Sequence, residues 1–216
     1  MAESNKIISF AGVKRGDVVY YIAKLLATFN EPVLVVDNSD QHDTFRSVHH
    51  KGDIDEAYVR NITFVRDIAF SERMISAFNY VIVYHGMDIE PTWWNNSDDR
   101  FIVTNYDRFD IDDIRDSMAN VAPEPIGLIF TDKVSGKITE RFIVEMLNLP
   151  EEVIEHAIEI PRDDAIEAAK LSLQHDRIYK VAKLPGSMKK ALTDIFERVT
   201  PEDKKRKMDK LFAKAC

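Results

Sequence analysis

The sequence predicts an α/β fold in which a mostly parallel sheet carries helices on both faces. Two observations predict it. Short, almost wholly apolar runs recur along the chain, which is typical of strands buried on both faces, and amphipathic stretches with helical periodicity separate them. Strand, helix and strand repeated in this order indicate parallel pairing, because consecutive parallel strands need a crossover connection.

The expected strands follow the apolar runs. The clearest runs are Ile7–Phe10, Val33–Val36, Val81–Tyr84, Phe101–Thr104 and Ile126–Phe130, and shorter ones are Thr63–Val65 and Ala157–Ile160. The helical patterns are Val18–Phe29, Phe70–Phe78, Ile111–Ala119 and Thr139–Leu147. The stretch Asp37–Asn61 is polar and poorly periodic, so we expect a loop there with one short helix at most. It follows the carboxyl end of a strand, where such sheets bind ligands.

Length and charge limit the classes of protein that fit. With 216 residues and 45% hydrophobic content, the chain can bury a single good core. We expect an α/β domain at 1–180 and a C-terminal helical extension at 181–216 that carries a basic amphipathic tail. The net charge of −8 argues against broad affinity for nucleic acid, which needs many cations gathered on one face.

Cysteine use and targeting patterns indicate a cytoplasmic protein. The one cysteine, Cys216, excludes an intramolecular disulfide and a multi-thiolate metal site. The N-terminal residues lack a signal-peptide pattern, and no apolar run is long enough to cross a bilayer. We therefore expect a cytoplasmic protein that is soluble or peripherally associated with a membrane.

The turn after the first strand is the most informative part of the sequence. Gly12 and Gly16 lie between an apolar strand and a helix, where nucleotide-binding folds place a glycine-rich phosphate loop. Ile22–Ala27 comes next in the helix, then a strand that ends in Asp37, and later the segment Ile158–Ala168. Over most of the chain, these segments resemble the MinD/ParA family of P-loop ATPases, the deviant Walker group.

Aligned with that family without gaps, the turn departs from the family motif. The family's signature lysine falls at Phe10, its third glycine at Lys14, its invariant lysine at Arg15, and its two threonines at Gly16 and Asp17. A side chain at position 14 crowds the backbone amides that face the phosphates. Arg15 keeps a positive charge, but its planar fork replaces a compact ammonium. Gly16 lacks the hydroxyl that holds Mg²⁺, and the Asp17 carboxylate repels a triphosphate.

Three further positions of the family pattern are changed. Ser39 falls on an acid used in hydrolysis, Tyr84 on the Mg²⁺-associated Asp, and Thr131 on a base-reading Asn. Pro161 lies in the best local match, the element beside the base. The resemblance therefore implies a degenerate nucleotide site composed of Gly12, Lys14, Arg15, Gly16, Asp17, Asp37, Thr131 and Pro161.

The C-terminal segment has a basic amphipathic pattern. Met208, Leu211 and Phe212 fall on one helical face, with Lys and Arg around the rest. Such a helix can lie in the surface of an anionic membrane, and MinD-like proteins carry a similar targeting helix at this end. The other interpretation is a terminal helix packed on the domain through the same residues, which the shortness of the apolar face favours.

Two other groups of residues have two interpretations each. Trp93 and Trp94 follow a strand end, so either one of them faces solvent and anchors a partner or both close over the sheet edge. His42, His49 and His50 invite a metal interpretation, but no Cys or well-spaced acid supports a tetrahedral site, so we expect no metal. The Asp residues between 107 and 116 fit a solvated helix start.

The sequence thus predicts a pseudo-ATPase of the MinD/ParA type without a cofactor. It would act as an adaptor or spatial-positioning factor for a bacterial assembly of the pilus, secretion, conjugation, flagellar or division kind. The expected partners are a protein of that assembly, a second copy of the chain and a membrane surface. Two alternatives stay open. A functional ATPase that binds ATP with Mg²⁺ through an unorthodox loop predicts an open, positively charged cavity at the turn, whereas a plain helper domain predicts a filled one.

Overall fold

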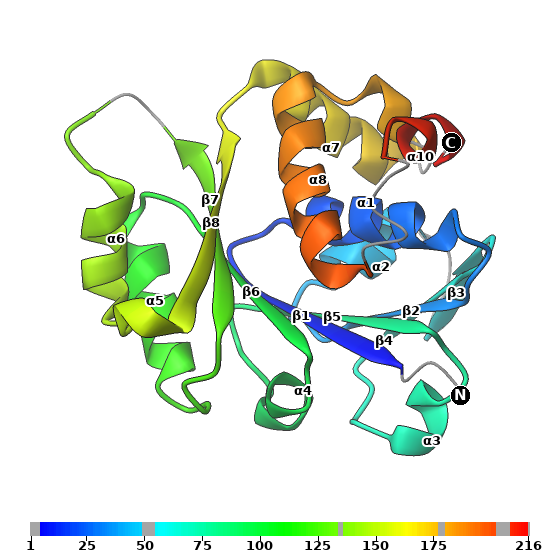
Figure 1. Ribbon diagram of the computed structural model, residues 1–216, viewed down its shortest axis with the longest axis horizontal. Coiled ribbons are helices and arrows are strands. Elements are labelled where there is room, and N and C mark those ends of the chain that lie inside the picture. Colours follow the sequence, from blue (N-terminus) through cyan, green and yellow to red (C-terminus); the bar gives the residue numbers. More distant parts are fainter. Residues whose placement is uncertain (1–4, 49–54, 134–135, 177–179, 202–207, 216) are drawn as a thin grey trace.

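The computed structural model describes residues 5–48, 55–133, 136–176, 180–201 and 208–215. Within these residues, an eight-stranded sheet has the strand order β3-β4-β2-β5-β1-β6-β7-β8 (Figure 1). Its neighbouring strands are parallel, except that β3 and β4 are antiparallel. The predicted α/β fold with a mostly parallel sheet is confirmed.

The strands largely follow the apolar runs. Their bounds are β1 Lys6–Gly12, β2 Val33–Asp37, β3 Glu56–Val59, β4 Ile62–Arg66, β5 Tyr80–Gly86, β6 Asp99–Thr104, β7 Ile126–Lys133 and β8 Ile154–Pro161. The helices are α1 Gly16–Ala27, α2 Asp43–Val48, α3 Glu72–Ile75, α4 Pro91–Asn95, α5 Arg108–Met118, α6 Glu140–Leu147, α7 Asp164–Asp176, α8 Gly186–Val199 and α10 Met208–Lys214.

Helices cover both faces of the sheet. α1, α2, α7, α8 and α10 lie on one side, and α3, α4, α5 and α6 lie on the other (Figure 1). Successive residues of a strand point to opposite faces, so Ile8 belongs to the core that includes α1, whereas Ile7 packs with Ile75 of α3 and Trp93 of α4. The carboxyl ends of the parallel strands meet at one edge, where β1 turns into α1.

Two segments differ from the sequence prediction. The stretch Asp37–Asn61 contains α2 and also the edge strand β3, which the hydrophobic pattern missed because only Ala57 in it is buried. The helical pattern Phe70–Phe78 contracts to the single turn of α3.

The two tryptophans lie in the short helix α4. Pro91 is its first residue, and the Glu90 carboxylate accepts hydrogen bonds from the backbone N–H groups of Thr92 and Trp93 at the helix start. Trp93 and Trp94 are both fully buried, and Trp93 Nε1 donates to the Ile68 carbonyl at 2.9 Å. The expectation that one of the pair faces solvent and contacts a partner is wrong, because both indoles close over the sheet.

The helices of the C-terminal segment share the core of the main domain. Leu211 and Phe212 of α10 are buried, and Met208 packs against the same core, to which α8 contributes Leu192 and Phe196. In this arrangement Met208, Leu211 and Phe212 pack on the domain, which is the second of the two interpretations, and their contact with a partner or a membrane stays a prediction. The basic residues at 204–207 lie outside the described residues. None of the described helices combines the length and apolar character needed to cross a membrane.

Candidate functional site

The turn between β1 and α1 is tied to the neighbouring strand. Gly12 has a φ of +112°, and the N–H of Val13 donates to the Val103 carbonyl of β6 at 2.9 Å. A Cβ atom on Gly12 would lie 1.9 Å from that carbonyl oxygen, so only glycine fits. The Val13 amide is thus satisfied by the sheet and does not face an anion.

Arg15 points into the protein from this turn. Its Nε and one terminal nitrogen each donate to an oxygen of the Asp17 carboxylate at 2.9 Å, and its other terminal nitrogen donates to Thr131 Oγ1 at 2.6 Å. Both charged side chains are almost fully buried. Burial alone would lower the pKa of the Arg15 guanidinium, but the charge and hydrogen bonds of Asp17, together with the charges of two further acids, outweigh it and the pKa is raised. The positive charge at this position is therefore neutralised within the chain.

Tyr84 occupies the position that the resemblance gives to a Mg²⁺-associated Asp. Its hydroxyl accepts a hydrogen bond from the Arg15 backbone N–H at 3.2 Å, and its ring is buried beneath the turn. Burial raises the pKa of the Tyr84 phenol, so it stays neutral. A neutral phenol is a poor substitute for the carboxylate oxygen that Mg²⁺ prefers.

Gly16, the first residue of α1, is covered by α2. A Cβ atom on Gly16 would lie 2.7 Å from Thr44 Oγ1, 3.1 Å from Thr44 N and 3.2 Å from the Asp43 Cβ. A Ser or Thr hydroxyl at this position has no room unless α2 moves. In the family, the resemblance gives this position a hydroxyl that holds Mg²⁺. Here the residue is glycine, and α2 occupies the space that a hydroxyl would need.

Asp37 at the end of β2 is committed to its own loop. Its two oxygens accept hydrogen bonds from Ser39 Oγ at 2.6 Å, Ser39 N at 3.2 Å and Phe45 N at 2.8 Å. Burial raises the pKa of the carboxyl above its usual value, although these hydrogen bonds oppose the rise. Asp37 holds the start of α2 against the sheet.

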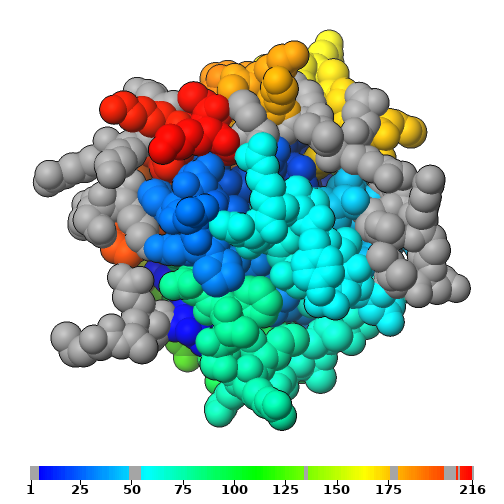
Figure 2. Space-filling model, turned by 90° about the vertical axis from the view of Figure 1, so that its right-hand side faces the viewer, coloured from blue at the N-terminus to red at the C-terminus, as the bar shows by residue number. Residues whose placement is uncertain are grey.

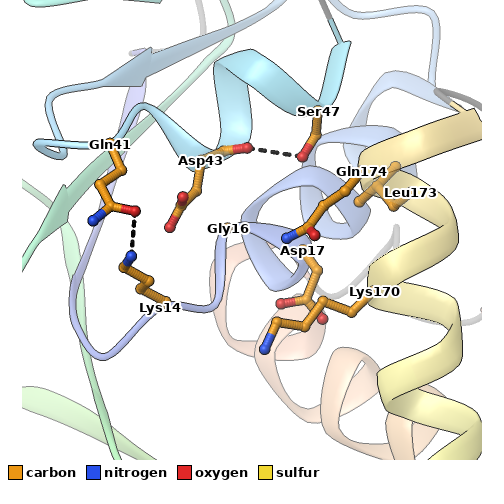
Figure 3. A pocket seen from close by; sticks show the side chains of 9 residues that line it. All are labelled: Lys14, Gly16, Asp17, Gln41, Asp43, Ser47, Lys170, Leu173 and Gln174. Atoms are coloured by element: carbon orange, nitrogen blue, oxygen red, sulfur yellow. Dashed lines mark hydrogen bonds between the residues drawn. The ribbon is translucent and has the colours of Figure 1, made fainter.

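A small pocket remains beside the turn (Figure 3). It has a volume of about 210 Å³, and Figure 3 shows Lys14 and Gln41 on one side of it and Lys170 and Gln174 of α7 on the other. Lys14 Nζ donates to Gln41 Oε1. The volume of the pocket is below the roughly 300–1,000 Å³ of typical small-molecule sites.

The charges around this pocket balance. Lys170 pairs with Glu167 at 3.5 Å and Asp17 pairs with Arg15 at 2.9 Å, so these pairs leave one cation, Lys14, and one acid, Asp43, among the described lining residues. These residues therefore do not form the open, strongly positive cavity that we expect of a working phosphate loop.

The structure brings together most of the residues that the sequence singled out. Arg15, Asp17 and Thr131 make one cluster, although Thr131 is 116 residues away from Arg15. Pro161 pairs with Lys133 at the end of the sheet next to that cluster. Sequence reasoning missed Lys170 and Gln174, because their i, i+4 spacing on α7 shows that they share a helix face but not that this face meets the turn.

The histidine and acidic groups form no metal cluster in the part of the chain that the structure describes. His42 Nε2 lies 3.2 Å from an Asp67 oxygen, and His49 and His50 lie outside the described residues. On α5, Arg115 pairs with both Asp112 and Asp116.

The sheet order and the strand, turn and helix at its carboxyl edge define the fold of MinD/ParA-type P-loop NTPases. No protein-family model matches the sequence, and no match was found among the curated proteins. Solved structures match along nearly the whole chain. A ParA family ATPase from Chlorobium tepidum is 17% identical, with a TM-score of 0.58 and coverage of 92% of this chain and 100% of its own.

Two more solved structures share this fold. MinD in the MinC:MinD cell division complex of Aquifex aeolicus is 13% identical, with a TM-score of 0.62 and coverage of 89% of this chain and 95% of its own. A plasmid partition protein from Borrelia burgdorferi bound to AMPPNP is 16% identical, with a TM-score of 0.53 and coverage of 90% and 99%. At these identities, the similarity establishes the fold.

Proposed function

We propose that the protein is a pseudo-ATPase of the MinD/ParA type that works in the cytoplasm as an adaptor or positioning factor for a bacterial assembly. The observation that carries the proposal is the buried Arg15–Asp17 pair. A cation that should meet the nucleotide phosphates is neutralised by a carboxylate two residues away and held by Thr131. Removing it from this cluster would leave the Asp17 charge buried and unpaired, which is costly.

Three neighbouring features support the same conclusion. Tyr84 supplies a neutral phenol in place of a carboxylate, α2 fills the space beside Gly16, and the remaining pocket has balanced charges. Together they oppose binding of a triphosphate with Mg²⁺. A protein partner then carries the function, as in the MinC:MinD complex, where the MinD structure is assembled with another protein. A homodimer is the second partner that fits a fold of this type.

The alternative is a functional ATPase with an unorthodox loop. Its supporting observation is the pocket at the start of α1, which Lys14 and Gly16 both line. It requires ATP with Mg²⁺ to enter a space of about 210 Å³ and to displace the Lys14–Gln41 contact.

A nucleotide titration tests the proposal. Calorimetry and thermal unfolding are measured with ATP and ADP at millimolar concentration with Mg²⁺. A ligand at 100 times its Kd stabilises a protein by about 2.7 kcal/mol, so binding would give a clear thermal shift. We expect neither heat of binding nor stabilisation. Saturable binding that Lys14→Ala abolishes would overturn the proposal and favour the ATPase.

A further inference from the structure

A second pocket lies beside α5, which is on the side of the sheet away from α1 (Figure 1). Its volume is about 510 Å³, against about 210 Å³ for the pocket at the β1–α1 turn. One wall is residues 87–89, which link β5 to α4, and the other is the surface of α5. The Ser117 hydroxyl of α5 accepts a hydrogen bond from the Ile89 backbone N–H at 3.0 Å, so the two walls are fastened to each other and the pocket is preformed.

The ionisable residues that line this pocket, among those the structure describes, are all acids. They are Asp88, Asp113 and Asp116, and all three are exposed. Asp116 pairs with Arg115 at 3.2 Å, whereas within the described residues Asp88 and Asp113 have no ion pair or hydrogen bond. Two negative charges therefore stay uncompensated. The carboxyl end of α5 also borders the pocket and adds roughly half a negative charge.

Apolar surface adjoins these acids. Ile89 and the half-buried Met87 line the pocket, and both pack against the main core. Phe109 at the start of α5 is 79% exposed. It is four residues before Asp113, so both side chains lie on one face of the helix, roughly 6 Å apart at Cβ. An exposed aromatic ring next to an open pocket is typical of a surface that anchors a partner.

The charge of the pocket decides which occupant fits. Uncompensated carboxylates repel nucleic acid, and they also repel a second copy of the same face. No group of three or more His, Cys, Asp or Glu side chains in the described part of the chain is arranged to hold a metal ion. Lysine and arginine side chains of a peptide do fit, because their apolar stems can pack on Ile89 and Phe109 while their charged ends reach Asp88 and Asp113.

We propose that this acidic pocket, with Asp88, Asp113 and the neighbouring Phe109, docks a basic and partly apolar peptide segment of a protein partner. The pocket would be the surface through which the adaptor holds its partner, so its biological role rests on the proposed function. The contact itself needs no nucleotide, because the pocket lies across the sheet from the β1–α1 turn.

The test is fluorescence anisotropy with the full chain and a short labelled peptide of alternating lysine and leucine. We expect saturable binding that weakens as salt rises, because exposed charges are screened. Peptides of the same length with glutamate in place of lysine, or with serine in place of leucine, should bind much more weakly. Asp88→Asn and Asp113→Asn should each weaken binding about threefold, the effect of one exposed ion pair, and Phe109→Ser about tenfold. All three side chains are exposed, so these substitutions should leave the fold intact.

Matched control variants separate the pocket from general attraction to an acidic protein. Asp40→Asn removes an exposed carboxylate from a turn, and Asp194→Asn removes one from the surface of α8. Tyr58→Ser removes an aromatic ring that is 67% exposed on β3, in the β3–β4 hairpin drawn in cyan in Figure 2, at the edge of the sheet far from α5. These three variants should bind the peptide as the wild type does.

Two results would overturn the inference. One is equal weakening by the pocket and control variants, which would mean that the net charge of −8 alone attracts the peptide. The other is no saturable binding at millimolar protein. Nucleotide binding at the turn would instead overturn the proposed function and leave the peptide titration unchanged, so the two failures are distinguishable.

Discussion

The Arg15 guanidinium holds the Asp17 carboxylate through two N–H···O bonds of 2.9 Å. A single residue, Gly16, separates them in the sequence, at the point where the turn enters α1. The fork of an arginine and the two oxygens of a carboxylate match in geometry, and such bidentate pairs are strong. The helix start that would receive a phosphate in this fold thus holds an internal ion pair.

Breaking this pair should strongly destabilise the protein. Arg15→Gln leaves the Asp17 carboxylate buried without its cation, and a broken buried pair costs about 3–5 kcal/mol. Urea unfolding measures the loss, and Arg108→Gln, which changes a guanidinium 80% exposed, is the control that should cost little. The double variant Arg15→Met with Asp17→Leu should recover most of the stability, since neither charge is then left alone. A loss of less than about 1 kcal/mol for Arg15→Gln would contradict this account.

Enlarging Gly16 should destabilise the protein, whereas the same change at Gly186 should not. Both glycines are the first residue of a helix. Alanine at Gly16 forces Thr44 of α2 away from the start of α1, and overpacking of this kind costs about 1–3 kcal/mol. Apart from its chain neighbours and the backbone of its own helix, nothing lies within 4 Å of the Cβ position at Gly186, so alanine there should stabilise by up to about 1 kcal/mol through lower chain entropy. Thermal unfolding compares the two variants, and equal shifts would refute the closed packing beside Gly16.

The sequence predicted the sheet better than it predicted the site. Runs such as Val33–Val36 show their burial directly, because every side chain in them is apolar. The contact of Arg15 with Thr131 joins the turn after β1 to β7, two strands away in the sheet, and no local pattern shows which way a side chain at a turn points. For a related reason, the sequence left open whether Trp93 and Trp94 are both buried. The Glu90–Pro91 helix start could have indicated α4, but only the packed structure shows what lies beneath it.

Asp37→Asn should loosen α2. The carboxylate accepts three hydrogen bonds from Ser39 and Phe45, and an amide nitrogen in place of one oxygen would face a donor. We expect a loss of about 1–3 kcal/mol in the free energy of unfolding, the cost of leaving a buried polar group unsatisfied. Hydrogen exchange should also show faster exchange of the Phe45 amide. The exposed Asp40 provides the control, because Asp40→Asn should change neither quantity.

His85 lies at the centre of a buried hydrogen-bond chain on the opposite face of the sheet. Its Nδ1 accepts from the Glu90 backbone N–H at 3.1 Å, so Nε2 carries the proton and donates to Ser9 Oγ at 3.0 Å. Ser9 Oγ in turn lies 2.8 Å from Ser97 Oγ, which donates to the Trp93 carbonyl. Only the neutral imidazole fits this chain, because a second proton at Nδ1 would face another donor.

Acid should therefore weaken the fold through His85. Burial lowers the pKa of His85 from 6.5 to about 4, so the unfolded chain takes up a proton at a higher pH than the folded one. The stabilising effect of the neutral ring is complete above pH 6.5, declines as pH falls towards 4, and amounts to about 3 kcal/mol. Urea unfolding between pH 7 and pH 4 should show a flatter pH dependence for His85→Gln than for the wild type, by up to that amount. His156→Gln, at an exposed position of β8, should keep the wild-type pH dependence. If the His85→Gln and wild-type curves run parallel, the buried imidazole is not the group that acid titrates.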